Sequence, residues 1–374
     1  MSFFQRVRRF WQRITEGLEI QQLWAQVRAD AQASYKLYAA DIEPLPDERD
    51  SLRRKPFRTI RRLLWAMAMK LSPARRVLFL ISLALLLMPA ISYNDANVGL
   101  GTEGFRFMGG IGLLLLLFLE LADRVIMKRD LEIAREIQGW LMPAEPPAVP
   151  SADIAFATRP ANTVAGDYYD AFFRPTAPGE DPRLLLVVAD VAGKSIPAAL
   201  VMATLQASLR TLAALPGSLP ELVGRFNDYA CAQNQSGRRF TTAFLAELEP
   251  ATGSLAWINA GHNWPVLRSR SGAVRRLDTG GLPLGIAKNA RYECGTAKLV
   301  SGDLLLIFTD GLVEAENDRE EEFDEPRMLE TLAASRGSAK ETLTELMSAV
   351  DAFVGQTRQH DDITCMVVRM VGSQ

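Results

Sequence analysis

The sequence predicts an α+β domain that follows a two-helix membrane segment. Two apolar runs, about 77–94 and 105–122, are separated only by a short polar loop, which is typical of a membrane-spanning hairpin. From residue 151 onward, short β-rich runs alternate with helical stretches. The hairpin-like spacing of strands between residues 241 and 308 favours antiparallel pairing, so this part is expected to be α+β or a layered sandwich.

The composition limits the classes of protein and site to consider. The 374 residues are 48% hydrophobic and 23% charged, which excludes wholesale disorder. Three widely spaced cysteines argue against a disulfide scaffold and fit a reducing compartment. With only two histidines and no CxxC pair, a zinc site of the usual Cys/His type is not expected.

Residues 1–76 form a basic, cytoplasmic helical region with a linker. They carry 16 Lys/Arg and 8 Asp/Glu, a net +8, whereas the rest of the chain carries −10, so contact with a membrane or polyanion is expected at this end only. Apolar residues at helical spacing in the first thirty positions predict an interfacial membrane helix, or else a helix packed on the protein or on a second subunit. Residues 41–58, with three prolines, are interpreted as the linker.

Residues 77–122 are interpreted as the hairpin itself. Residues 77–94 contain no charge and would cross about 27 Å of hydrocarbon. The alternative for each run is a buried helix of a soluble domain. The connecting loop 95–104 has no Lys or Arg, whereas both outer flanks do, so the positive-inside rule places both termini and the following domain in the cytoplasm. We therefore expect a two-pass protein of the inner membrane, with membrane lipid as a partner.

Residues 123–143 are expected to form a helix that connects the hairpin to the next domain. Its apolar stripe is partial, because Asp130 interrupts it, so a long coiled coil is not secure. It is interpreted as a signalling helix that also mediates a homodimer, or alternatively as the first helix of the next domain. The proline-rich segment 143–150 ends it.

Residues 144–374 are expected to form the catalytic domain. No GxxxxGK[ST] phosphate loop and no GxGxxG after a strand occur in the sequence, so nucleotide-kinase and dinucleotide functions lack their usual signal. The expected strands are 154–158, 184–188, 243–248, 255–258, 304–308 and 363–368, and the expected helices are 197–214, 219–232, 326–334 and 339–354.

Aspartates recur in this domain where strands end, beside small residues. They are Asp167, Asp190, Asp310, Asp361 and Asp362. A carboxylate at the buried end of a strand loses contact with water, which costs free energy. A positive charge close to it is needed to compensate. Oxygen ligands without His or Cys suit Mg²⁺ or Mn²⁺, and two such ions can activate water and bind a phosphoryl oxygen. The alternative for any one of them is an ordinary Asp-Gly turn.

Seven motifs in order resemble the SpoIIE/RsbU-like branch of the metal-dependent protein phosphatase 2C superfamily. The resemblance covers about residues 131–370, over half the chain, and nothing before residue 120 takes part. The motifs are REIQGWLMP, PANTVAGDYYD, VVADVAGKSIPAALVMA, INAGHNWPVL, GGLPLG, GDLLLIFTDGLVEAEN and HDDITCMVVR.

The resemblance implies a four-layer α/β/β/α sandwich that hydrolyses phosphoserine or phosphothreonine on a protein, with water activated by two Mn²⁺ or Mg²⁺ ions. The substrate implied is a phosphorylated regulator such as a STAS-type anti-sigma-factor antagonist, in partner-switching signalling. By motif, Asp167 corresponds to an acid near the second metal, and Asp190 corresponds to the acid that bridges both metals. The carbonyl of Val191 corresponds to a backbone ligand, and Asp310 and Asp361 correspond to ligands of the first metal. Asp362 stands where the family is often acidic or Asn, and it is predicted as a further metal residue.

Other residues of the motifs have weaker assignments. Ala165, Ala192 and Ser195 replace small residues common in the family, which changes loop flexibility more than metal binding. No general acid is evident: His262 is interpreted as structural, and His360 either tunes Asp361 or is merely exposed beside it. The remaining candidates for phosphate contact are Lys194 and Arg159.

Three alternative functions remain. The first is a catalytically weak or inactive phosphatase fold that serves as an adaptor or receptor for a signalling partner, which the intact Asp set disfavours. The second is a membrane receptor, for which the loop 95–104 leaves little room for a ligand pocket. The third is another two-metal enzyme such as a nuclease, and the acidic body disfavours a nucleic-acid partner.

Overall fold

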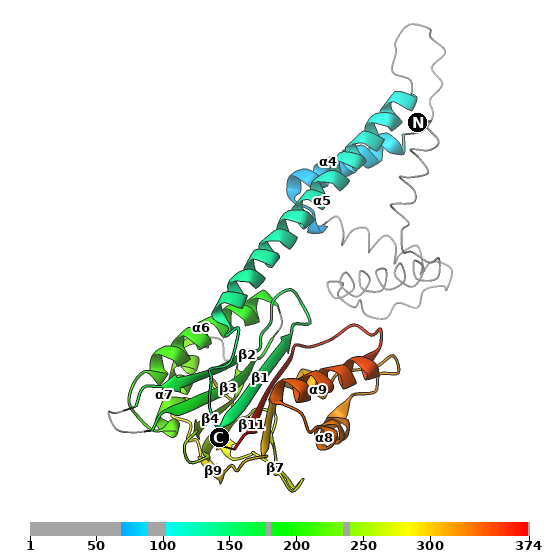
Figure 1. Ribbon diagram of the computed structural model, residues 1–374. Helices are drawn as coiled ribbons and strands as arrows, with labels where there is room; N and C mark the ends of the chain where they lie inside the picture. The colour runs from blue at the N-terminus through cyan, green and yellow to red at the C-terminus, as the bar shows by residue number, and fades with distance from the viewer. Residues whose placement is uncertain (1–68, 89–101, 177–180, 194, 235–239, 373–374) are drawn as a thin grey trace, which may run out of the picture. The chain divides into compact units, whose positions relative to one another are not determined.

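The computed structural model describes residues 69–88, 102–176, 181–193, 195–234 and 240–372 (Figure 1). The expected amphipathic helix of the first thirty residues, the linker 41–58, the end of the first apolar run and Lys194 lie outside the described residues. The chain divides into two compact units, residues 1–126 and 127–374, which are described separately.

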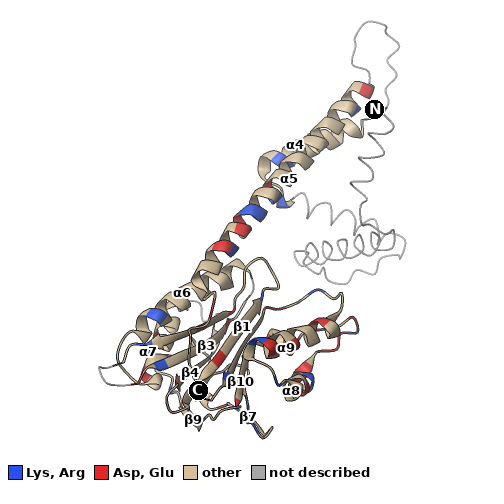
Figure 2. Ribbon diagram, viewed as in Figure 1, with Lys and Arg blue, Asp and Glu red and all other residues tan. Residues whose placement is uncertain are grey.

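The described part of the first unit is a pair of helices. Helix α4 spans Pro73–Leu86, and its first position holds a proline, whose fixed φ suits a helix start. Helix α5 spans Thr102–Leu141 without a break, so the second apolar run and the expected connecting helix are one continuous helix. Figure 2 shows the ribbon of α5 coloured for charged residues on either side of an uncharged stretch.

The two helices pack closely where small residues meet. Ser82 of α4 is only 2% exposed, and a Cβ added to Gly112 of α5 would lie 2.1 Å from its Oγ. Arg75 of α4 pairs with Glu120 at 3.2 Å and Asp123 at 2.5 Å. These contacts make the two helices antiparallel neighbours. Helix α5 is long and apolar enough to cross a membrane.

The second unit contains two sheets packed face to face, antiparallel except where β8 pairs in parallel with β5. The first has the order β1-β11-β10-β6-β7, and the second has the order β2-β3-β4-β5-β8, with β9 also paired to β5. The strands are β1 Ala152–Arg159, β2 Tyr168–Arg174, β3 Arg183–Val191, β4 Thr241–Glu249, β5 Ser254–Ala260, β6 Val266–Arg268, β7 Val274–Arg276, β8 Gly280–Gly281, β9 Gly295–Lys298, β10 Leu304–Phe308 and β11 Ile363–Met370.

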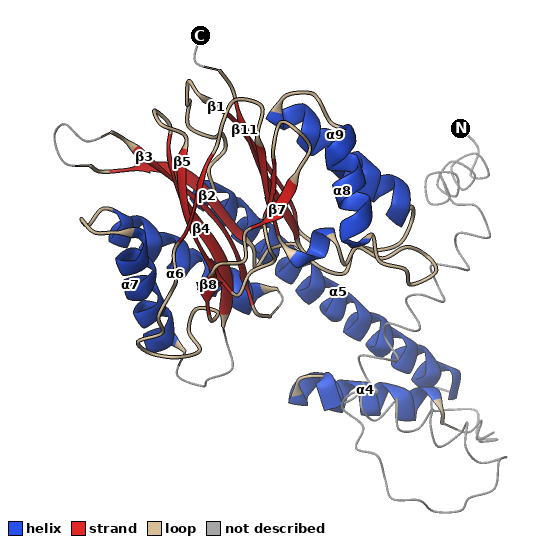
Figure 3. Cartoon of the chain, turned by 90° about the horizontal axis from the view of Figure 1, so that it is seen from below, coloured by secondary structure: helices blue, strands red, loops and turns tan. Residues whose placement is uncertain are grey.

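Helix pairs cover the outer faces of the sheets (Figure 3). Helices α6 (Ile196–Ala213) and α7 (Leu219–Gln233) pack on the β2–β5 sheet, and α8 (Asp324–Ala334) and α9 (Ala339–Val354) pack on the other. The chain therefore has the four-layer α/β/β/α architecture. Each expected strand and helix of this unit has a counterpart whose ends agree within three residues, whereas β2, β6, β7, β8 and β9 were not expected.

Burial on both faces explains why the central strands are apolar throughout. In β3, Leu184 and Leu186 contribute to the core between the sheets, and Leu185 and Val187 contribute to the core under α6 and α7. Side chains alternate along a strand, so a strand with helices on one side and a second sheet on the other needs apolar residues at every position. A polar residue at the end of such a strand departs from this pattern, and the candidate site lies at these strand ends.

Candidate functional site

The acidic residues singled out in the sequence lie at one end of the sandwich. Asp190 is the penultimate residue of β3, and Asp167 directly precedes β2, whose Tyr168 pairs with Ala189 of β3. Asp310 opens the 3-10 turn η1 (Asp310–Leu312) after β10. Asp361 and Asp362 directly precede β11. The antiparallel pairing of β10 with β11 brings these ends together.

A buried threonine connects the acids of the two sheets. Thr309, between β10 and Asp310, is fully buried, and its Oγ1 donates a hydrogen bond to Asp167 Oδ2 at 2.9 Å. The same Oγ1 accepts a hydrogen bond from the backbone N–H of Thr364 at 2.9 Å. Thr309 therefore fixes the carboxylate of Asp167 relative to β11. Sequence reasoning missed this residue, and its position directly before the aspartate of the IFTDG motif was the available signal.

The electrostatics show that the carboxylates converge. Burial, followed by the negative charges of Asp310, Asp361 and Asp362, raises the pKa of Asp190 to about 7. Asp167 is only 1% exposed, and burial together with the charge of Asp190 raises its pKa well above its ordinary value. Such repulsion is relieved when cations bind among the carboxylates.

The chemistry of these donors fits hard divalent cations. All the converging side chains supply oxygen, and the Val191 carbonyl lies beside Gly166, where an added Cβ would be 3.3 Å from it. Gly311 is equally constrained, because its Cβ would lie 2.1 Å from the Asp362 carbonyl oxygen. Within the described ranges, however, no three His, Cys, Asp or Glu side chains are already drawn together as a metal-binding group.

Asp362 has a distinct role in the geometry. Its Oδ1 accepts a hydrogen bond from the Ala161 N–H at 2.7 Å, and its Oδ2 accepts one from the Gly166 N–H at 2.7 Å. Both carboxylate oxygens thus hold the loop that leads to Asp167. Asp362 was predicted as a further metal residue, and these bonds indicate that it positions the loop.

Gln138, near the C-terminal end of α5, holds the same loop from the other side. Its Nε2 donates to the Ala165 carbonyl at 2.7 Å, and its Oε1 accepts from the Ala165 N–H at 3.0 Å. The amide thus engages both backbone groups of a residue two positions before Asp167. Sequence reasoning did not single out Gln138, although it lies in the first motif.

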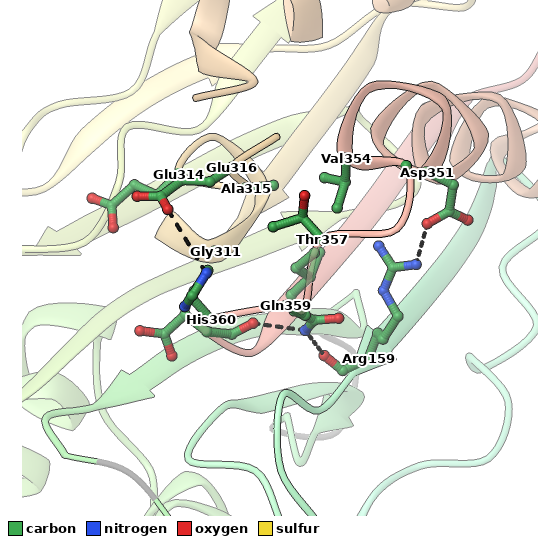
Figure 4. Close-up of a pocket in the computed structure, with 13 residues that line it drawn as sticks. Arg159, Gly311, Glu314, Ala315, Glu316, Asp351, Val354, Thr357, Gln359 and His360 are labelled. Carbon is green, nitrogen blue, oxygen red and sulfur yellow. Dashed lines mark hydrogen bonds and ion pairs between the residues drawn. The ribbon is translucent and has the colours of Figure 1, made fainter. Parts of the chain in front are cut away.

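A pocket of about 200 Å³ adjoins Asp361 and Gly311 (Figure 4). Arg159 lies at its wall and pairs with Asp351 of α9. His360 also lines the pocket, with Nε2 3.8 Å from Glu316 Oε2. The pocket places one candidate for phosphate contact, Arg159, beside the acidic cluster.

His262 is a buried residue rather than an exposed acid or base. Its Nδ1 lies 3.0 Å from Thr242 Oγ1, and its backbone N–H donates to Asn259 Oδ1 at 2.7 Å. Burial lowers the pKa of His262 to about 4, so the imidazole is neutral at physiological pH. The contacts fit the structural interpretation of the AGHN motif.

Comparison with known proteins identifies relatives of the catalytic unit. The family described as Stage II sporulation protein E (SpoIIE) matches residues 180–371, just over half of the chain, and Asp167 precedes that match. Protein IcfG of Synechocystis is 28% identical over 308 residues, which is 74% of this chain and 48% of IcfG. Phosphoserine phosphatase RsbU of Bacillus subtilis is 28% identical over 246 residues, which is 65% of this chain and 70% of RsbU.

A solved structure shares the fold. The SiaA-PP2C domain of Pseudomonas aeruginosa superposes with a TM-score of 0.56 at 22% identity, over 67% of this chain and 99% of that domain. The chain spans about half the length of IcfG, whereas it covers nearly all of the SiaA domain. The family match, at residues 180–371, lies within the sandwich.

Proposed function

The chain belongs to the SpoIIE family, and from that premise we propose that it is a metal-dependent protein serine/threonine phosphatase. The observation that carries the proposal is the placement of Asp167, Asp190, Asp310 and Asp361 at strand ends that the pairing brings to one end of the two sheets. A cluster of this charge beside an open pocket suits phosphate-ester hydrolysis assisted by two Mn²⁺ or Mg²⁺ ions.

Each protein group in the proposed site has a separate task. Bound divalent cations would supply acidified water and positive charge for the phosphoryl oxygens. Asp167, Asp190, Asp310, Asp361 and the Val191 carbonyl would hold them. Thr309 and Asp362 keep the loop of Asp167 in place through the hydrogen bonds described above. Because these groups are fixed by the sheets, little reorganisation is needed during the reaction.

We further propose that the substrate is a phosphorylated signalling protein of the STAS type. Support comes from the similarity to RsbU, which is named a phosphoserine phosphatase and is matched over 70% of its length. The acidic composition of residues 77–374 makes a nucleic-acid substrate the weaker alternative.

We propose that helices α4 and α5 anchor the enzyme in the inner membrane, with both termini in the cytoplasm. Support comes from the close α4–α5 packing at Ser82 and from the apolar side chains that these helices expose, among them Leu80 and Phe107. A homodimer through residues 120–142 is proposed because Ile133 and Ile137 of α5 are also exposed, at 47% and 46%.

One fractionation experiment tests both proposals. Membranes from cells that express the full chain should release phosphate from a phosphoserine protein with Mn²⁺ or Mg²⁺, and removing the metal should stop the release. The soluble fraction should be inactive. Activity found only in the soluble fraction would contradict the anchor, and metal-independent release would contradict the mechanism. Mn²⁺ binding to the full chain without any turnover would favour the adaptor function.

The Gln138 contact leads to a prediction about metal affinity. Gln138→Leu removes both hydrogen bonds to Ala165 and leaves the loop of Asp167 held by Asp362 and Thr309. Loss of a group that orients a ligand typically costs 10–100-fold in metal affinity or activity, so we expect Mn²⁺ to bind about tenfold or more weakly. Calorimetric titration with Mn²⁺ measures this, beside phosphatase assays at saturating metal.

Gln206→Leu is the matched control. Gln206 of α6 also contacts the end of α5, donating to the Leu141 carbonyl at 3.2 Å, but it does not touch the loop of Asp167. Its replacement should change Mn²⁺ affinity by less than about threefold. Equal effects of the two substitutions would show that Gln138 acts only by docking the helix.

A further inference from the structure

Four arginines gather at the end of the sandwich opposite the acidic cluster. Arg268 and Arg369 lie on strands β6 and β11, Arg270 follows β6, and Arg336 follows α8. All four line one pocket of about 380 Å³. Eight residues of extended chain separate Asp361 from Arg369, roughly 26 Å, so this pocket is remote from the proposed active site.

The sheet register places two of these arginines on one face. Leu304 of β10 pairs with Arg268 on one side and with Arg369 on the other. Residues directly opposite each other across antiparallel strands share a face, so both guanidinium groups lie on the α8 side of the sheet. Arg268 is only 6% exposed, and burial and the charges of Arg369 and Arg336 lower its pKa.

Nearby acids do not neutralise this cluster. None of the four arginines forms an ion pair within the part of the chain that the structure describes. Asp303 accepts hydrogen bonds from the backbone N–H groups of Arg270 and Val300 instead. Asp153, the cross-strand neighbour of Arg369, accepts one from the Ala339 N–H.

The contacts of the guanidinium groups leave donors unused. Arg268 donates to the carbonyls of Leu332 and Ser335 at the end of α8, and Arg369 Nη2 donates to Thr342 Oγ1 at 3.1 Å. Arg369 Nε is buried and has no hydrogen-bond partner among the described residues. The hydrogen bonds to the last carbonyls of α8 explain why Arg268 is buried at this position. They do not explain why Arg369 and Arg270 border the same pocket.

Part of the lining of this pocket is apolar. Leu329 and Leu332 of α8 and Val274 of β7 contribute to it, and α8 and β7 lie near each other in Figure 3. Guanidinium groups favour phosphate and carboxylate, with which they form paired hydrogen bonds. A pocket of a few hundred cubic ångströms with an apolar wall suits a small molecule rather than a protein segment.

We propose that this arginine pocket binds a small organic oxyanion, a phosphate ester or carboxylate with an apolar body, at a site separate from the acidic cluster. The anion would lie between Arg369 and Arg270, and the apolar body would lie against Leu329. The site needs no metal, and its existence does not depend on the phosphatase activity.

Calorimetric titration of the full chain in detergent and metal-free buffer tests the proposal. The probes are phenyl phosphate and phenylacetate, which share an apolar ring and differ in the anionic group. At least one should bind in the millimolar range or tighter, at constant ionic strength. The double variant Arg270→Gln/Arg336→Gln, whose side chains are exposed, should weaken binding tenfold or more, and so should Arg369→Gln.

Two controls keep the result specific. Arg319→Gln removes an exposed arginine outside the pocket and should leave the affinity unchanged. Asp190→Asn alters the acidic cluster and should not weaken binding of either probe. No binding of either probe to the unsubstituted chain would overturn the proposal, and so would binding that survives both arginine variants.

Discussion

Asp190→Asn and Asp310→Asn are each expected to lower metal-dependent phosphate release by roughly 10³-fold or more, because each removes one charge from the site that holds the cations. Asp190 lies at the end of β3, where the negative charges of Asp310, Asp361 and Asp362 contribute to its raised pKa. Asparagine keeps the shape and one oxygen but not the charge. The measurement is turnover of a phosphoserine protein at saturating Mn²⁺, together with Mn²⁺ affinity by calorimetry.

The same substitutions should not destabilise the metal-free protein. Without cations the carboxylates repel one another, so removing one charge should leave the thermal midpoint unchanged or higher. Asp318→Asn, an exposed acid outside the cluster, should alter neither activity nor Mn²⁺ affinity. Full activity in Asp190→Asn, or unfolding of both variants, would contradict the assignment of these residues as cation ligands.

The sequence predicted the sandwich well because burial on both faces leaves an unambiguous pattern. The apolar run in β3 and the one in β10 are each followed by an aspartate. The same stretch of sequence therefore predicted both the strand and a residue of the candidate site. Strand β2 was missed because its sequence, YYDAFFR, contains Asp170 and Arg174, which look like surface residues. In the structure both are buried and paired, Asp170 with Arg210 at 2.7 Å.

Contacts between distant segments could not be predicted from one sequence. In the sequence, Asp362 appeared to be one more acidic ligand. Only the fold shows that the backbone N–H groups of Ala161 and Gly166 donate hydrogen bonds to its two carboxylate oxygens. Thr309 and Gln138 were missed because threonine and glutamine are common in strands and helices, although each lies in one of the quoted motifs. The short strands β6 to β9 carry too few residues to show an alternating pattern.

Arg174→Met is expected to have the largest effect on stability, lowering the free energy of unfolding by about 3–5 kcal/mol. Arg174 of β2 and Glu247 of β4 form an ion pair in which each residue is only 7% exposed. Arg174 also donates to the carbonyls of Ala213, Leu215 and Gly217. Methionine would leave the carboxylate and those carbonyls buried without this donor. A total stability of about 5–15 kcal/mol makes the loss severe.

Arg183→Met separates this effect from a general loss of positive charge. Arg183 lies 3.8 Å from the other oxygen of the same Glu247, but its side chain is 43% exposed, so its removal should cost less than about 1 kcal/mol. Urea unfolding of residues 127–374 in metal-free buffer, followed by tryptophan fluorescence, measures both variants. Arg174→Met/Glu247→Leu should recover part of the loss, because no unpaired carboxylate then remains buried. Similar costs for Arg174→Met and Arg183→Met would mean that the buried pair contributes no more than a surface one.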